Sequence, residues 1–88
     1  MSETMKMIAD IGLIPQISLN DPEDAGPLGR ALVKGGIPIA EVALHQDTSL
    51  KVIQTLSKQV PDIIVGAGMI RTVDQARSAV KAGARFLI

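Results

Sequence analysis

The sequence predicts an α/β fold of the parallel (β/α) TIM-barrel type, and the chain holds the first four strand–helix units, a half barrel. Segments rich in Ile, Val and Leu alternate with helical patterns, and the apolar segments begin roughly every 24 residues, the length of one tight strand–helix unit. Near-continuous apolar runs are typical of strands covered on both faces, as in parallel sheets. Strands that alternate with helices through short connections predict a parallel sheet with right-handed crossovers.

The boundaries of the predicted elements follow from these runs. The expected strands are Ile14–Leu19, Ile37–Leu44, Ile63–Gly66 and Arg85–Ile88. A leading helix is expected over about 3–11, with Gly12 as its stop. At this length, we expect residues 1–88 to form a single domain.

The helices between the predicted strands have recognisable ends. Asp21 places a capping carboxylate before Pro22, and Gly35–Gly36 ends that helix. The next helix begins near residues 47–48 and ends before Pro61.

The last predicted helix opens with a capping box, in which Thr72 and Gln75 satisfy each other's backbone donors, and it ends at Gly83. The apolar positions expected to be buried on the three later helices are Ala25, Leu28, Ala31, Leu32, Leu50, Ile53, Leu56, Val60, Ala76, Ala79 and Val80. Part of one unit, Ala31–Gly36, is echoed by Ser78–Gly83. Periodicity does not decide between a barrel and an open doubly wound sheet, but the regular unit length favours the barrel.

Composition limits the kinds of partner. The chain has a formal net charge of zero and Phe86 is its only aromatic residue. It therefore has neither a basic stripe for a phosphate backbone nor stacking platforms for bases, so no nucleic-acid partner is expected. The hydrophobic content of 47% predicts a packed core, which must be aliphatic.

The absence of cysteine excludes disulfides and thiolate metal sites, and it suits a reducing compartment. With a single histidine, no metal site is expected. No apolar run approaches the roughly 20 residues that a transmembrane helix needs. The charged residues of the first 12 positions do not fit a signal peptide. We therefore expect a cytoplasmic protein with no membrane partner.

Functional residues of such a fold lie at the C-terminal ends of the strands. Glu41 lies in an otherwise apolar strand, where an unpaired carboxylate is costly. Inside a barrel such a group is suited to general acid/base chemistry, and the alternative is a structural salt bridge. His45 shares a strand face with Glu41 if the strand stays regular, and it is either a ligand-contacting residue or an ordinary polar loop residue.

Another candidate is the run Gly66–Ala67–Gly68 at the end of the third strand. It lets backbone N–H groups approach a bound group closely, although it is not a dinucleotide fingerprint. Arg71 could hold an anion nearby, but a solvated arginine is the more ordinary interpretation.

Several of these segments taken together resemble one family. They are Ile14–Pro15, Ala31–Leu32–Val33, Gly35–Gly36–Ile37, Glu41–Val42, Val60–Pro61, Ile64–Val65–Gly66–Ala67–Gly68 and Ala82–Gly83–Ala84–Arg85–Phe86. In this order and spacing the chain resembles the N-terminal half of the 2-keto-3-deoxy-6-phosphogluconate (KDPG) and 4-hydroxy-2-oxoglutarate (KHG) aldolases, class I aldolases with a (β/α)8 barrel. The resemblance implies reversible aldol cleavage of a 2-oxo acid to pyruvate and an aldehyde, through a lysine Schiff base and without a cofactor.

The resemblance also implies roles for individual residues. Glu41 matches the acid/base glutamate of the family. His45 and Met69 fall where the family normally has an arginine and a threonine that contact the substrate, with Gly66 and Gly68 beside them. Both departures bring the usual substrate into question.

The family carries its Schiff-base lysine on the sixth strand, beyond the four strands of this chain. The chain alone is therefore expected to be inactive, because Lys34, Lys51, Lys58 and Lys81 fall on predicted helices. Two other functions stay open: a non-catalytic half barrel for binding or assembly, and another phosphate-handling (β/α) barrel enzyme. Exposed sheet edges and an exposed inner face predict a homo-oligomer, such as a dimer that completes a barrel.

Overall fold

A computed structural model describes residues 2–45 and 47–88. Its strands are β1 (Gln16–Ile17), β2 (Ile39–Ala43), β3 (Ile64–Gly68) and β4 (Phe86–Leu87). Its α-helices are α1 (Glu3–Ile11), α2 (Ala25–Lys34), α3 (Ser49–Gln59) and α4 (Val73–Ala82), and a 3₁₀ turn, η1 (Pro22–Asp24), precedes α2.

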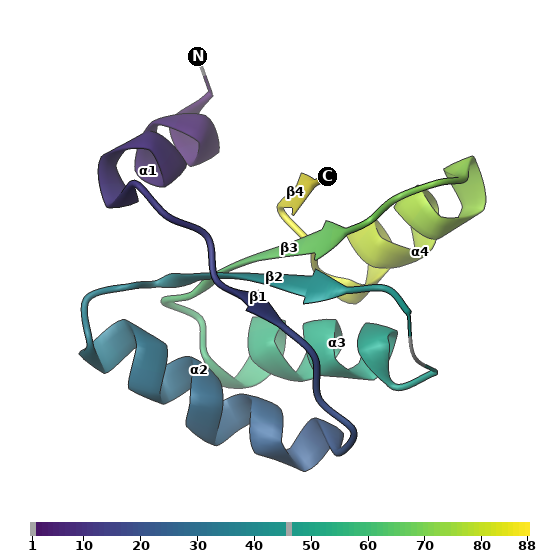
Figure 1. The fold of residues 1–88 in the computed structure, drawn as a ribbon, viewed down its shortest axis with the longest axis horizontal. Coiled ribbons are helices and arrows are strands. Elements are labelled where there is room, and N and C mark those ends of the chain that lie inside the picture. Colours follow the sequence, from purple (N-terminus) through teal and green to yellow (C-terminus); the bar gives the residue numbers. More distant parts are fainter. Residues whose placement is uncertain (1, 46) are drawn as a thin grey trace.

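The sheet is parallel, and its strands lie in the order of the sequence, β1-β2-β3-β4. Helix α3 packs against both α2 and α4, so these three helices form one row along one face of the sheet (Figure 1). A doubly wound sheet would reverse its strand order and carry helices on both faces. The sequential order with a single row of helices is the arrangement of a (β/α) barrel, which confirms the predicted fold class.

The core lies between the sheet and this row of helices. Alternate strand residues point toward the helices and are nearly inaccessible: Ala40, Val42, Val65 and Ala67. On the helix side they meet side chains that are also fully buried: Ala25, Val52, Ile53, Leu56 and Ala79. The core is aliphatic, as the composition predicts.

The other face of the sheet is the one that faces inward in a barrel. The remaining strand positions point to it, among them Gln16, Glu41, Gly66 and Phe86. Helix α1 lies on this side (Figure 1) and contributes no buried residue. It is tied to the start of β4 by a hydrogen bond of 3.2 Å from the Arg85 guanidinium to the Thr4 hydroxyl.

Most helix ends agree with the sequence signals, but Asp21 caps the 3₁₀ turn η1, and α2 itself begins only at Ala25. Gly12 stops α1 in the left-handed conformation at φ 83°, and the Asp21 carboxylate accepts a hydrogen bond from the Glu23 N–H at 2.9 Å. The Thr72 hydroxyl accepts from the Gln75 N–H at 3.0 Å, and the Gln75 carbonyl oxygen accepts from the Thr72 N–H at 3.3 Å, which confirms the predicted capping box.

Three residues predicted to be buried are exposed, and one of them is Ala31 on α2. Leu50 is 39% exposed at the N-terminal end of α3, and Val80 is 57% exposed on α4. Val80 lies with Ala76 in an apolar surface hollow that α3 does not cover. A barrel helix normally packs between two neighbours, and within the described part of the chain the extensive helix contact of α4 is with α3.

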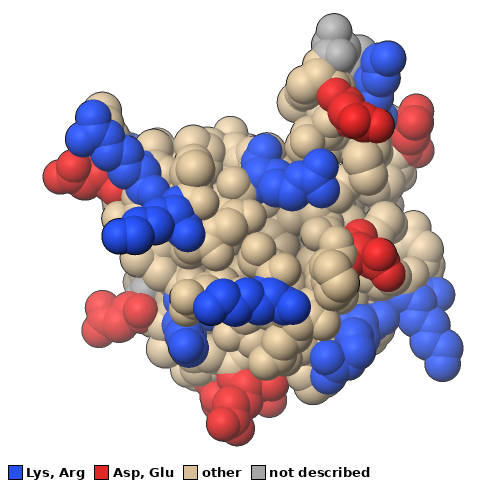
Figure 2. All heavy atoms as spheres, turned by 180° about the vertical axis from the view of Figure 1, so that it is seen from behind, with Lys and Arg blue, Asp and Glu red and all other residues tan. Residues whose placement is uncertain are grey.

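Charged side chains surround the core without gathering by sign. Figure 2 shows basic and acidic groups mixed on the side turned away from the viewer of Figure 1. Within residues 2–45 and 47–88, no helix has the length and apolar character needed to cross a membrane.

We expect Thr72→Ala to lower the free energy of unfolding by about 1 kcal/mol, because it leaves the first turn of α4 without its capping acceptor. Thr55→Ala removes a hydroxyl inside α3 that bonds only the Lys51 carbonyl, so its effect should stay within about 0.5 kcal/mol. Urea unfolding of both variants measures the difference. Equal stability of the two would show that the capping box contributes nothing.

Candidate functional site

The inner face carries a row of side chains that crosses the sheet. The strand register aligns Gln16 with Glu41, Glu41 with Gly66, and Gly66 with Phe86. Glu41 lies in the second strand of this row and is half-buried. The apolar sequence of β2 fixes this position, since Ala40 and Val42 must face the helices and Glu41 therefore points the other way.

The Glu41 carboxylate is held from two sides. On the β1 side, the Gln16 Nε2 donates a hydrogen bond of 2.9 Å to Oε2. On the β3 side the carboxylate lies against Gly68, where an added Cβ would come within 2.6 Å of Oε2. Glutamate at position 41 thus depends on a glycine in the neighbouring strand. The partner that the described residues give this carboxylate is a neutral amide, and the salt bridge to a basic residue missing from this chain stays an untested alternative.

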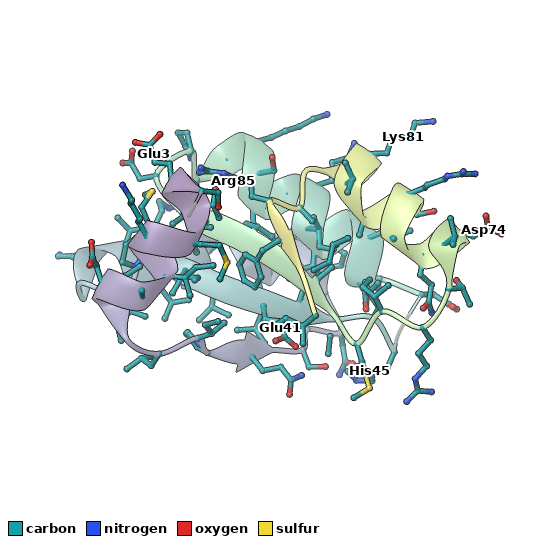
Figure 3. All side chains as sticks on the ribbon, turned by 90° about the horizontal axis from the view of Figure 1, so that it is seen from above. Glu3, Glu41, His45, Asp74, Lys81 and Arg85 are labelled. Atoms are coloured by element: carbon teal, nitrogen blue, oxygen red, sulfur yellow. The ribbon has the colours of Figure 1, made fainter. Side chains whose placement is uncertain are left out.

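His45 follows β2, further along the direction of the strand than Glu41 (Figure 3). Its Nε2 lies 2.9 Å from the Ser18 Oγ, and the tautomer of the ring decides which of the two donates. The ends of β1 and β2 are thus joined by side chains at two levels, Gln16 to Glu41 and Ser18 to His45.

A pocket of about 370 Å³ opens at this end of the sheet. Its lining residues are Gln16, Ala43, Leu44, His45, Met69, Arg71 and Gln75. Two predicted site residues, His45 and Met69, therefore share one pocket, and Gln16 links it to Glu41. Met69 is 61% exposed and contributes an apolar wall, while His45 and Arg71 contribute the groups that can attract an anion.

The glycines of β3 give space to this chain's own side chains. A Cβ on Gly66 would overlap the Phe86 ring, and one on Gly68 would crowd the Glu41 carboxylate. Both glycines are buried, and their close contact with a substrate stays a prediction.

Comparison with known proteins adds the decisive observation. A profile of the KDPG and KHG aldolase family matches residues 4–88. The chain belongs to this family. It is 38% identical over 78 residues to the 2-dehydro-3-deoxy-phosphogluconate aldolase of Treponema pallidum, covering 89% of this chain and 37% of that protein. The chain thus spans little more than a third of the length of this relative.

Solved aldolases have the same fold over the shared part. The KDPG aldolase of Legionella pneumophila, with pyruvate captured as a covalent carbinolamine, matches with a TM-score of 0.79 and 42% identity, covering 84% of this chain and 36% of that one. The Zymomonas mobilis 2-keto-3-deoxy-6-phosphogluconate aldolase with 3-phosphoglycerate gives a TM-score of 0.83 at 31% identity, covering 94% and 41%.

The sequence reasoning did not single out Gln16, and it placed Ser18 at the functional end of the first strand without pairing it with His45. The signal for both was present. Gln16 and Ser18 are the polar residues of the apolar segment Ile14–Leu19, and they share a face because their spacing is two.

Another hollow, of about 400 Å³, lies between the N-terminal ends of α3 and α4. Its lining includes Asp47 and Asp74 but none of Gln16, Glu41 and His45. Within residues 2–45 and 47–88, no three acidic or histidine side chains are grouped so that they could hold a metal ion.

Proposed function

We propose that this chain supplies the proton-transferring half of a class I aldolase that cleaves a 2-oxo acid to pyruvate and an aldehyde. The observation that carries the proposal is Glu41, a half-buried carboxylate held on the inner face beside the strand-end pocket. A carboxylate in such a position can move a proton to and from a bound substrate.

The nucleophile in this proposal is a lysine amine outside this chain. Lys34, Lys51, Lys58 and Lys81 lie on α2, α3 and α4, on the helix side of the sheet. The remaining lysine, Lys6, is exposed on α1. A Legionella relative solved with pyruvate as a covalent carbinolamine supports amine chemistry for the family. The imine withdraws electrons from the neighbouring carbon, and Glu41 takes or returns the proton there.

The other site residues are proposed to bind the substrate. The proposed role of His45 is to contact the carboxylate of the 2-oxo acid through a protonated ring, and its contact with Ser18 and its position in the pocket support this role. Met69 forms the apolar wall of the pocket, and Gly66 and Gly68 are proposed to contact the substrate beside Glu41, outside the lining of that pocket.

We also propose that the sheet is completed by a partner, such as a second copy of the chain in a homo-oligomer. In the described residues β1 and β4 are edge strands, and Leu87 and Ile88 are 41% and 54% exposed. Unpaired parallel edges and exposed apolar side chains favour association.

We also propose a cytoplasmic location, which the lack of cysteine fits.

A complementation experiment tests the enzymatic proposal. The chain is mixed with the separately produced C-terminal half of the Legionella KDPG aldolase, which supplies the second half of a barrel. Pyruvate release is measured from 2-keto-3-deoxy-6-phosphogluconate and from 4-hydroxy-2-oxoglutarate, and the pyruvate adduct is trapped with borohydride. We expect activity from the mixture and none from either half alone.

The matched control is the N-terminal half of the Legionella protein with the same C-terminal half. If that pair is active and the pair containing this chain is not, the chain is better described as a binding or assembly module. That alternative is favoured by the departures at His45 and Met69. A borohydride-trapped adduct on the chain alone would contradict the placement of the nucleophile outside it.

A further inference from the structure

Gln16 is a hydrogen-bond partner of Glu41 across the sheet. Their Cα atoms are register partners, and the Glu41 N–H donates to the Pro15 carbonyl at 2.9 Å, which fixes the two strands beside the side-chain contact. The Gln16 Nε2 then donates to Oε2 of Glu41 at 2.9 Å. The backbone thus sets the alignment, and the side-chain bond is an addition to it.

The two carboxylate oxygens of Glu41 have different surroundings. Oε2 accepts the bond from Gln16 and lies against Gly68. Within residues 2–45 and 47–88, Oε1 takes part in no hydrogen bond. A carboxylate confined at one oxygen is oriented, and its other oxygen is the one available to a substrate.

We propose that Gln16 is a positioning residue for Glu41, which by holding Oε2 leaves Oε1 as the oxygen that exchanges a proton with the substrate carbon. This inference rests on the proposed function. It assigns a task to Gln16, which shares the strand-end pocket with His45 and Met69.

In the proposed step a proton passes from the substrate carbon to Glu41. A protonated imine links the external lysine amine to the 2-oxo acid. Oε1 takes a proton from the carbon next to the imine carbon, the C–H electron pair becomes a carbon–carbon double bond, and the imine π pair moves to nitrogen, which leaves a neutral enamine. The Gln16 N–H donor occupies Oε2 of the carboxylate during this step. The reverse step returns a proton from Glu41 to carbon.

A merely structural role for Gln16 predicts different results. In that case Gln16→Leu would change stability and affect every step of catalysis alike. In the positioning role the variant folds normally and loses only proton transfer, because the backbone bonds beside it keep the strand register. Gln59→Leu on α3 makes the same chemical change at an exposed position on the helix side and serves as the control.

The first measurement uses the chain alone. Nuclear magnetic resonance follows the Gln16 side-chain amide while the Glu41 carboxyl is titrated. We expect the Gln16 amide signals to move together with the Glu41 carboxyl signal and to lose this response in Glu41→Gln. Gln16 signals that ignore the titration would overturn the inference without any reference to aldolase activity.

The second measurement uses the chain reconstituted with the Legionella C-terminal half. Borohydride trapping reports imine formation, and deuterium uptake from solvent into the methyl group of pyruvate reports proton transfer. We expect Gln16→Leu to lower deuterium uptake about 10- to 100-fold with trapping unchanged, and Gln59→Leu to alter neither. Normal uptake in a trapped Gln16→Leu enzyme would overturn the positioning role alone. Absence of trapping with the unaltered chain would instead overturn the proposed function, and the positioning role with it.

Discussion

Replacing Glu41 by glutamine is expected to lower aldol cleavage by the reconstituted enzyme at least about 100-fold, because an amide of the same size cannot take a proton from carbon. The amide still fits beside Gly68 and can still bond to Gln16, so the fold should be unchanged. In the proposed mechanism Glu41 acts on the substrate carbon after the imine has formed, so borohydride trapping should persist. The measurement is the steady-state rate of pyruvate release beside the yield of trapped adduct.

Glu23→Gln provides the matched control, since Glu23 is exposed on η1 and the substitution removes the same charge. Its activity should equal that of the unaltered chain. If Glu41→Gln retains full activity, Glu41 is dispensable and the chain is better explained as part of another phosphate-handling barrel enzyme. If trapping disappears together with activity, Glu41 has a role before proton transfer.

Helix positions could be predicted from the sequence because their signals are local. The capping box at Thr72 and the left-handed glycine at Gly12 involve residues within one turn of the helix, and both are present. The lengths of the strands could be predicted less well from the sequence. The predicted strand Ile14–Leu19 is reduced to Gln16–Ile17, because an edge strand has one partner and keeps only the pairs that β2 provides.

The site shows the same division between local and long-range information. Alternation along β2 places Glu41 on the inner face, and a single strand suffices for that inference. The bond from Gln16 to Glu41 joins residues 25 positions apart, and it depends on the register between β1 and β2. The same limit explains the glycines of β3, because the side chains that fill their space come from β2 and β4.

Gly66→Ala is expected to lower the free energy of unfolding by about 2 kcal/mol, because the new Cβ would overlap the Phe86 ring and force it off β3. Phe86 is a register partner of Gly66 and one of the two residues of β4, so its displacement loosens that edge strand. Urea unfolding measures the loss, and hydrogen exchange at residues 86–88 reports the loosening. Gly35→Ala, at an ordinary φ of −80°, should stay within about 1 kcal/mol of the unaltered chain.

A double-mutant cycle separates this overlap from a general cost of alanine in the strand. In a Phe86→Leu background the ring is gone, so Gly66→Ala should cost at least about 0.5 kcal/mol less than it does beside phenylalanine. An equal cost in both backgrounds would mean that the ring does not determine the need for glycine. Coupling of the expected size would show that the ring of Phe86, the only aromatic residue of the chain, occupies the space that Gly66 leaves free. Gly66 would then keep β4 in place beside the row that holds Glu41.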